Sequence, residues 1–212
     1  MIGEDMLFDT FGDSDVFLNN IRKFNVDLAK IRHIVLSHDD WDHISGLWQV
    51  IPERKDITVY ICPGFNPEIK ERLASLGAKV IEAAKPMEIK ENIYSTGGLY
   101  GESPDRKICE QSLVIRTAEG LAVICGCAHP GAVNIVKHAK ESFHAEVCLL
   151  MGGFHLKDNT AETNINIIKA LQALGVRKAA PMHCTGTAAT EAMRQAFGEG
   201  FMLAEEGMEV DL

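Results

Sequence analysis

The chain has 212 residues, a length that suits one large α/β domain or two small ones. Hydrophobic residues make up 46% and charged residues 24%, an ordinary globular composition that excludes wholesale disorder, collagen-like repeats and disulfide miniproteins. The 30 acidic residues outnumber the 21 basic ones, and the resulting charge of -9 disfavours a nucleic-acid partner.

The first residues are acidic where a secretory signal needs basic ones, and no long apolar segment follows them. The longest apolar stretches, such as residues 121–125 and 147–151, are far shorter than the roughly 20 residues that span a bilayer. We therefore expect a cytoplasmic protein without a membrane partner. Six scattered cysteines favour reduced thiols, and Cys125-Gly126-Cys127 is interpreted as structural because its spacing fits neither a zinc knuckle nor a thioredoxin-type pair.

Strands and helices alternate in the first half of the chain. The β-branched run at residues 31–37 predicts a strand that ends in a polar cluster, and helical apolar spacing follows at residues 44–50, before Pro52. The next predicted elements are a strand at 57–62, a helix at 67–76 closed by Gly77, and a strand at 79–83. Residues 86–106 contain several glycines and prolines and predict hairpins and loops.

The second half repeats this alternation. Strands at 113–116 and 121–125 predict a hairpin around Ala118-Glu119-Gly120, and Pro130 suits the first turn of a helix at 132–143. The remaining predicted elements are a strand at 146–151, a helix at 163–174, a strand at 178–182 and a helix through Phe197. Because no linker rich in Pro, Gly or Ser divides the chain, we expect one domain over residues 1–212.

Four of the predicted strands each run into a loop whose first residues include a histidine. These histidines are His38 with His43, His129, His155 and His183. Since the carboxyl ends of strands in α/β sheets deliver side chains to a ligand crevice, this placement predicts a functional site.

The densest group of candidate ligands is His38-x-Asp40-x-Asp42-His43, which holds four metal-competent side chains in six residues. In an extended loop the first three can point the same way, whereas Asp42 and the adjacent His43 can reach a neighbouring position as the helix begins. Two metal sites are therefore geometrically compatible with this segment.

Several of these residues also have a purely structural interpretation. Asp42 alone could be the N-cap of the following helix, and Asp39 is interpreted as a solvated side chain. A lone His129 or His183 could be held by backbone groups. The occurrence of four such loops together favours a functional site.

Other chemistry-bearing residues are interpreted as incidental. His33, His138 and His144 lie at a strand start or beside charged residues on a helix. Trp41 is interpreted as a packing residue rather than a substrate contact. Cys184 follows a candidate ligand, but no base identifies it as a catalytic thiol.

Residues 37–46, Ser-His-Asp-Asp-Trp-Asp-His-Ile-Ser-Gly, resemble the His-x-His-x-Asp-His signature of the metallo-β-lactamase superfamily, and Leu7-Phe8-Asp9-Thr10 resembles the Asp-Thr-Gly strand before it. Four further motifs resemble the branch named for dihydropterin-ribofuranosylaminobenzene-phosphate synthase: Glu110-Gln111-Ser112-Leu113, Gly126-Cys127-Ala128-His129-Pro130-Gly131, Gly152-Gly153-Phe154-His155-Leu156 and Pro181-Met182-His183-Cys184-Thr185-Gly186. The resemblance implies an α/β fold, a four-layer αββα sandwich of the metallo-β-lactamase type, here with a shortened N-terminal half.

The resemblance also implies a metal centre, with three departures from the family pattern. Asp40 replaces the second histidine of the signature. Its carboxylate is a harder donor than imidazole, which shifts the preference of the first metal site from zinc towards iron or manganese. Gly152 and Gly153 stand where a bridging aspartate is expected, so His155 becomes the candidate ligand or substrate contact. The chain also begins almost at the Asp-Thr motif. The implied ligands are His38, Asp40 and His129 for a first metal and Asp42, His43 and His183 for a second.

These features predict a metal-dependent hydrolase or transferase that holds one or two divalent ions, zinc first, with iron or manganese as alternatives. The metal would lower the pKa of water and polarise a phosphoryl or acyl oxygen, with Asp42 and His155 as catalytic residues. The branch name suggests a phosphate- or pyrophosphate-bearing, pterin-like small molecule as substrate. A degenerate metal- or ligand-binding relative and an iron-dependent redox protein remain alternatives. A homodimer is compatible with pairing at an exposed strand edge.

Overall fold

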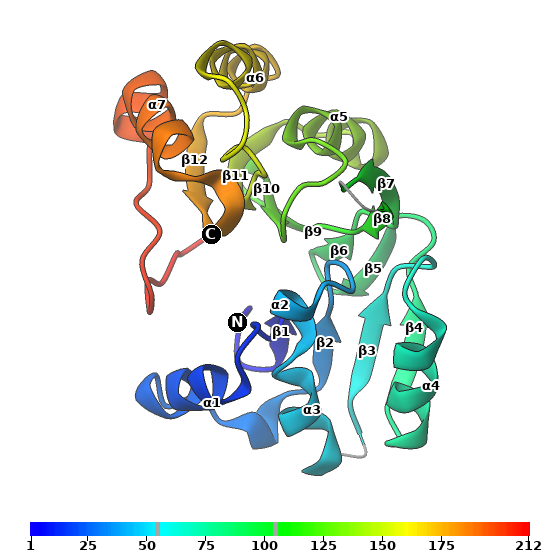
Figure 1. The fold of residues 1–212 in the computed structure, drawn as a ribbon. Helices are drawn as coiled ribbons and strands as arrows, with labels where there is room; N and C mark the ends of the chain where they lie inside the picture. Colours follow the sequence, from blue (N-terminus) through cyan, green and yellow to red (C-terminus); the bar gives the residue numbers. More distant parts are fainter. Residues whose placement is uncertain (54–55, 104–105) are drawn as a thin grey trace. The chain divides into compact units, whose positions relative to one another are not determined.

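The computed structural model describes residues 1–53, 56–103 and 106–212. The chain forms two compact units, Met1–Ala84 and Lys85–Leu212, each built from alternating strands and helices (Figure 1). The α/β class predicted from the sequence is thereby confirmed, whereas the single domain over residues 1–212 stays a prediction. No described helix combines the length and the apolarity needed to cross a membrane.

The first unit contains a four-stranded parallel sheet in the order β1-β2-β3-β4. Its strands are β1 (Met6–Phe8), β2 (His33–Val35), β3 (Thr58–Ile61) and β4 (Lys79–Glu82). The helices between them are α1 (Ser14–Lys23), α2 (Trp41–Ile44), α3 (Leu47–Val50) and α4 (Pro67–Ser75), with 3₁₀ turns at Leu28–Lys30 and Ile51–Glu53. Most apolar side chains of β1, β2 and β3 are almost completely buried, as expected for parallel strands.

The helix predicted at residues 44–50 is wrong, because the chain forms two short helices there. The break falls at Gly46, whose N–H donates to the carbonyl oxygen of Thr10 at 3.2 Å. A Cβ at Gly46 would collide with Thr10 O and lie 2.7 Å from the ring of Phe17. Close packing against this distant segment, rather than local helix propensity, sets the break.

Helix α1 was not predicted, although its start carries a capping signal. The Asp13 side chain accepts hydrogen bonds from the N–H groups of Asp15 and Val16, both at 2.9 Å. An Asp at this position satisfies backbone donors that the first helical turn leaves unpaired.

The second unit contains a mixed six-stranded sheet in the order β12-β11-β10-β9-β6-β5. Its strands are β5 (Met87–Lys90), β6 (Ile93–Ser95), β9 (Leu113–Thr117), β10 (Gly120–Cys125), β11 (Val147–Gly153) and β12 (Lys178–Met182). A two-stranded ribbon is formed by β7 (Leu99–Glu102) and β8 (Lys107–Glu110). Strands β10, β11 and β12 are parallel, so their carboxyl ends lie at one edge of the sheet.

Three helices cover this sheet: α5 (Ala132–Phe143), α6 (Ala161–Ala173) and α7 (Thr187–Phe197). Helix α5 packs against β11 and α7 against β12, and α6 contacts both helices (Figure 1). The predicted bounds of α5 and β12 and the β9–β10 hairpin are confirmed. Pro130 lies outside the first turn of α5, because Gly131 is the N-cap, so that prediction is wrong.

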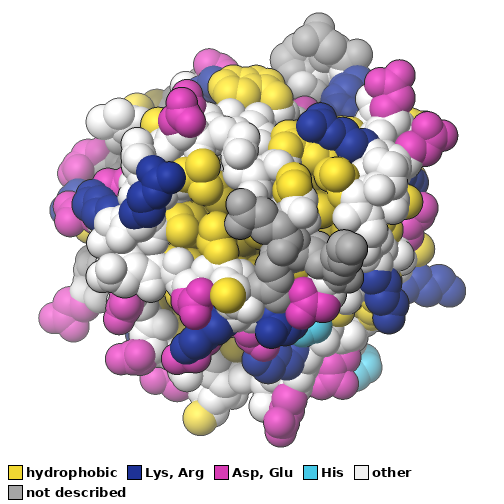
Figure 2. Space-filling model, turned by 90° about the horizontal axis from the view of Figure 1, so that it is seen from below, with side chains coloured by type: hydrophobic (Ala, Val, Ile, Leu, Met, Phe, Trp, Pro, Cys, Tyr) yellow, Lys and Arg dark blue, Asp and Glu magenta, His cyan; other side chains and the backbone are white. Residues whose placement is uncertain are grey.

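Charged side chains are interspersed on the face drawn in Figure 2. Acidic and basic groups alternate around hydrophobic ones, and the described residues of this face do not gather into a broad basic patch. On this face the charges of the described residues are therefore mixed rather than gathered into a field of one sign.

Candidate metal centre

Asp9 organises the loop at the carboxyl end of β2. Its carboxylate accepts hydrogen bonds of 2.7 Å from both the backbone N–H and the hydroxyl of Ser37, and it lies 2.7 Å from Nδ1 of His43. The same hydroxyl lies 2.8 Å from Nδ1 of His38. Because the hydroxyl proton goes to Asp9, the Ser37 oxygen accepts from the His38 ring. Both imidazoles are thus held with the proton on Nδ1 and the lone pair on Nε2, the arrangement that suits a metal ligand.

Each of these histidines lies beside an aspartate of the same segment. Nε2 of His38 is 3.4 Å from Oδ2 of Asp40, and Nε2 of His43 is 3.7 Å from Oδ2 of Asp42. The two imidazole rings lie side by side, with centroids 4.2 Å apart. Two ligands about 2.0 to 2.1 Å from a tetrahedral metal are roughly 3.4 Å apart, so both pairs fit the spacing of ligands on one ion.

The structural interpretations of the aspartates are wrong. The N-cap of α2 is Asp40, not Asp42, and Asp40 makes no side-chain capping hydrogen bond. Asp39 is not simply solvated, because its carboxylate accepts a hydrogen bond of 2.8 Å from the backbone N–H of Asn66. Asp39 therefore ties the histidine loop to the start of α4.

The sequence-based prediction that Trp41 is a packing residue is wrong. Its side chain is 71% exposed, although it stands between Asp40 and Asp42. A large apolar ring next to candidate metal ligands is available to a ligand rather than to the core.

Glu110 orients a histidine in the second unit, as Asp9 does in the first. Its side chain is completely buried, and its carboxylate accepts backbone hydrogen bonds from Cys127 at 3.0 Å, Ala128 at 2.8 Å and His129 at 2.8 Å. It also lies 2.9 Å from Nδ1 of His129, which places the lone pair of that ring on Nε2. Ala128 adopts a left-handed conformation (φ 58°), which lets the three N–H groups converge on one anion.

The role of Glu110 was missed at the level of sequence. The sequence marks Glu110 only as part of a motif, although an acidic side chain directly after the strand sequence Lys107-Ile108-Cys109 is a signal for such a role. A buried carboxylate is stable only with several donors, and these donors come from residues 17 to 19 positions further along the chain.

The two glycines at the end of β11 exclude a carboxylate there. A Cβ at Gly152 would collide with the carbonyl oxygen of Cys125, and one at Gly153 would collide with that of Gly126. A Cβ at Gly153 would also lie 2.8 Å from Sγ of Cys184. Packing therefore accounts for the absence of the aspartate that the family pattern leads one to expect at this point.

The surroundings of Cys184 favour its thiolate form, which the sequence alone could not show. Hydrogen bonding with the Cys127 side chain and with the backbone N–H of His155, 3.3 Å away, lowers the pKa of the Cys184 thiol to about 5, despite the opposing effect of burial. Cys125 has the opposite setting, because burial raises its thiol pKa to about 12. The two thiols differ in environment although both belong to the second unit.

His155 and His183 both follow strand ends in strained conformations. His155 follows β11 with φ 50°, and its ring centroid lies 4.7 Å from that of His129. His183 follows β12 with φ 51° and is exposed. Left-handed backbone in a non-glycine residue is costly, and it concentrates at functional sites.

The three histidines interpreted as incidental lie outside these clusters. His33 lies 3.3 Å from the hydroxyl of Tyr60, and Nε2 of His138 lies 3.0 Å from the carbonyl oxygen of Thr96. His144 is the C-cap of α5.

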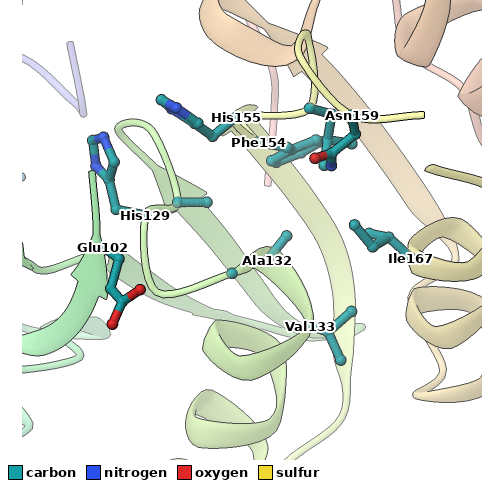
Figure 3. Close-up of a pocket in the computed structure, with 11 residues that line it drawn as sticks. Glu102, His129, Ala132, Val133, Phe154, His155, Asn159 and Ile167 are labelled. Atoms are coloured by element: carbon teal, nitrogen blue, oxygen red, sulfur yellow. The ribbon is translucent and has the colours of Figure 1, made fainter. Parts of the chain in front are cut away.

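A small cavity adjoins His129 and His155 in the second unit (Figure 3). Its volume is about 200 Å³, enough for one ring or a short chain rather than a whole drug-sized molecule. The two imidazoles lie at one end, and aliphatic side chains line the other (Figure 3). The lining residues are Glu102, Ala128, His129, Gly131, Ala132, Val133, Phe154, His155, Leu156, Asn159 and Ile167.

Comparison with known proteins shows which sequences this chain resembles. The model of the metallo-beta-lactamase superfamily matches residues 3–128. A curated protein of Methanocaldococcus jannaschii, 7,8-dihydropterin-6-methyl-4-(beta-D-ribofuranosyl)-aminobenzene-5'-phosphate synthase, is 30% identical over 236 residues, which cover 92% of this chain and 80% of the relative.

Solved structures agree with this assignment. Tm1679, described as a metal-dependent hydrolase of the beta-lactamase superfamily, has a TM-score of 0.81 at 28% identity and covers 98% of this chain and 89% of its own. YhfI from Bacillus subtilis, a metallo-beta-lactamase fold protein, has a TM-score of 0.72 at 14% identity, with 98% and 88% covered, and shares the fold. The predicted fold is confirmed, and the chain belongs to the metallo-β-lactamase superfamily.

Proposed function

We propose that the protein is a metal-dependent hydrolase or transferase acting on a small molecule that carries a phosphate or pyrophosphate and a pterin-like ring. Membership of the superfamily supports the metal-dependent chemistry, and the synthase at 30% identity supports the pterin-related substrate. The observation that carries the proposal is the pair of histidine–aspartate contacts at ligand spacing, His38 with Asp40 and His43 with Asp42.

The proposed ligands remain those of the family pattern. Zinc is the proposed metal, with iron or manganese as alternatives because Asp40 adds a hard oxygen donor. When bound, the metal supplies Lewis acidity towards a phosphoryl or acyl oxygen and lowers the pKa of water. The ligand set is His38, Asp40, Asp42, His43, His129 and His183.

The residues of the chain supply positioning around this chemistry. Asp9 and Glu110 fix the tautomers of His43 and His129, so no reorganisation of these rings is needed when a metal binds. Asp42 is proposed to orient the nucleophile as well as to bind metal. His155, at the end of the apolar cavity, is proposed to contact the substrate.

Recognition of a flat ring has two candidate surfaces. The exposed Trp41 indole offers a stacking face in the first unit, and the cavity beside His129 offers an apolar enclosure in the second. The phosphate groups of the substrate would be repelled by a protein of net charge -9 unless bound cations neutralise them.

The test begins with protein purified without a metal-affinity tag. Elemental analysis gives the metal content, and metal-free protein is then reconstituted with zinc, ferrous iron or manganese. Each form is assayed on phosphodiester, pyrophosphate, thioester and pyrophosphate-bearing pterin substrates. We expect turnover that chelation abolishes and metal addition restores.

Two variants and two contrary outcomes complete this test. His43→Ala should abolish turnover, whereas His33→Ala, in the same unit but outside the cluster, should retain it. Folded, metal-replete protein that is inactive on the whole panel would support the non-catalytic binder. Bound iron with oxygen-dependent spectral changes would support the redox alternative.

A further inference from the structure

Three potential metal ligands of the second unit converge although none of them belongs to the proposed ligand set. The sulfur atoms of Cys127 and Cys184 and a ring nitrogen of His155 all lie within 4.8 Å of one another. They follow β10, β11 and β12, three neighbouring parallel strands whose carboxyl ends share one edge. The convergence therefore follows from the sheet topology and not from a local sequence motif.

The backbone around these side chains keeps the space between them clear. The glycine at position 153 has no Cβ, which would lie 2.8 Å from Sγ of Cys184. The backbone N–H of His155 points to that same sulfur at 3.3 Å, and the Cys184 thiol lies 3.7 Å from the carbonyl oxygen of Cys127. Cys184 is thus held between the loops that carry the other two ligands.

The imidazole of His155 has a buried polar atom without a partner among the described residues. Its Nδ1 is shielded from solvent and makes no hydrogen bond. A buried ring nitrogen without a partner is energetically unfavourable, and coordination of a metal ion is one interaction that would satisfy it. The left-handed backbone of His155 adds conformational strain at the same residue.

We propose that Cys127, His155 and Cys184 form a thiolate metal site that binds zinc or another thiophilic divalent cation. Two sulfurs about 2.3 Å from a tetrahedral zinc ion lie roughly 3.8 Å apart, within the separation found here. Two thiolates and one imidazole prefer zinc over hard ions such as magnesium or manganese. Three protein ligands leave a fourth position open, as in zinc sites that accept a further ligand.

Cobalt substitution tests the site independently of catalysis. Thiolate coordination to Co²⁺ gives intense charge-transfer absorption in the near ultraviolet, which nitrogen and oxygen ligands do not give. We expect this absorption in the cobalt-loaded full chain, kept reduced with a phosphine. Cys127→Ser and Cys184→Ser should each lower it by about half, and the double variant should lose it together with one equivalent of zinc by elemental analysis.

Matched variants separate this site from the proposed catalytic ligands. Cys148→Ser removes another buried thiol of the same unit, one that donates to the carbonyl of Leu121, and should leave the absorption unchanged. His43→Ala should abolish turnover and keep the absorption. His155→Gln should keep the two thiolate ligands but weaken cobalt binding at least tenfold.

Three results would overturn the site: wild-type protein saturated with cobalt but lacking the absorption, a folded double variant that retains it, or its loss in Cys148→Ser. Circular dichroism establishes folding for every variant. If the double variant fails to fold, the two single variants and His155→Gln decide the question. Absence of turnover with intact, cysteine-dependent absorption would contradict the proposed function and leave the thiolate site standing.

Discussion

The two units orient a histidine by the same device but anchor it differently. Asp9 receives one backbone N–H, one hydroxyl and the His43 ring, whereas Glu110 receives three successive backbone N–H groups and the His129 ring. The Asp9 side chain is 13% exposed and that of Glu110 is fully buried. Glu110 therefore maintains the conformation of a loop, while Asp9 mainly maintains the orientation of side chains.

The units differ also in the donors that surround these histidines. In the first unit the neighbours are the carboxylates of Asp40 and Asp42, which are hard donors. In the second unit the thiols of Cys127 and Cys184, which are soft donors, lie beside His155. A single superfamily fold thus offers two chemically distinct environments, and substitutions in each should have different consequences.

The largest expected effect is on stability, in Glu110→Gln. The amide presents a donor to backbone N–H groups and removes the buried charge that they solvate, so we expect the free energy of unfolding to fall by about 3 kcal/mol, more than a hundredfold in the unfolding equilibrium. Urea denaturation measures this change. Glu102→Gln, at an exposed position of β7, should change it by less than about 0.5 kcal/mol. Equal free energies of unfolding in Glu110→Gln and Glu102→Gln would show that Glu110 does not maintain its loop. That result would contradict the contrast with Asp9.

The next effect concerns thiol reactivity in metal-free protein. At pH 7 a thiol with a pKa of about 5 is almost fully ionised, whereas an ordinary thiol is only about 3% ionised. When each alkylation rate is divided by its maximum at alkaline pH, the value for Cys184 at pH 7 should therefore be roughly thirtyfold higher than that for an ordinary cysteine. The rate should fall as pH decreases through 5, because protonation removes the nucleophile.

Peptide mapping after alkylation distinguishes Cys184 from its neighbours. Cys125 should stay unmodified up to pH 9, since burial shields it and raises its pKa to about 12. Cys184→Ser should eliminate the fast adduct. A half-maximal rate near pH 8.5 for Cys184 would refute the contrast between these thiols.

A smaller effect is expected for Asp9→Asn. Loss of the carboxylate that orients His43 should weaken metal binding about tenfold, and unfolding free energy should fall by only about 1 kcal/mol. Competition with a chromogenic chelator measures the affinity. The control Asp13→Asn affects the N-cap of α1 and should leave metal affinity unchanged. Unchanged affinity in Asp9→Asn would show that the carboxylate acts on folding alone.

The smallest expected effect is that of Trp41→Ala. If the exposed indole stacks on the substrate, KM should rise about three- to tenfold, with kcat and the unfolding midpoint nearly unchanged. Phe24→Ala, another exposed aromatic of the same unit, should leave KM unchanged. An unaltered KM in Trp41→Ala would leave substrate recognition to the cavity in the second unit.

Patterns of apolar residues located most of the regular structure. Helix α5 and strand β12 have the predicted bounds, because α5 carries a buried apolar stripe of helical period and β12 a short continuous buried run. Apolar patterns could not predict the helix break at Gly46, because it depends on Thr10 and Phe17, which pack against it from a distant part of the chain. They could not predict the exposure of Trp41 either, because hydrophobicity does not distinguish a core residue from a ligand-binding one.

The sequence by itself determined the family, the alternation of strands and helices, and the ligand-rich segment from His38 to His43, because these depend on local order and composition. The tertiary structure decided which ring nitrogen carries the proton, through contacts such as that of Asp9 with His43, 34 residues away. It also brought Cys127 and Cys184 together, 57 residues apart. Hydrogen bonds and donor distances of this kind depend on the register of neighbouring strands, which no local pattern specifies.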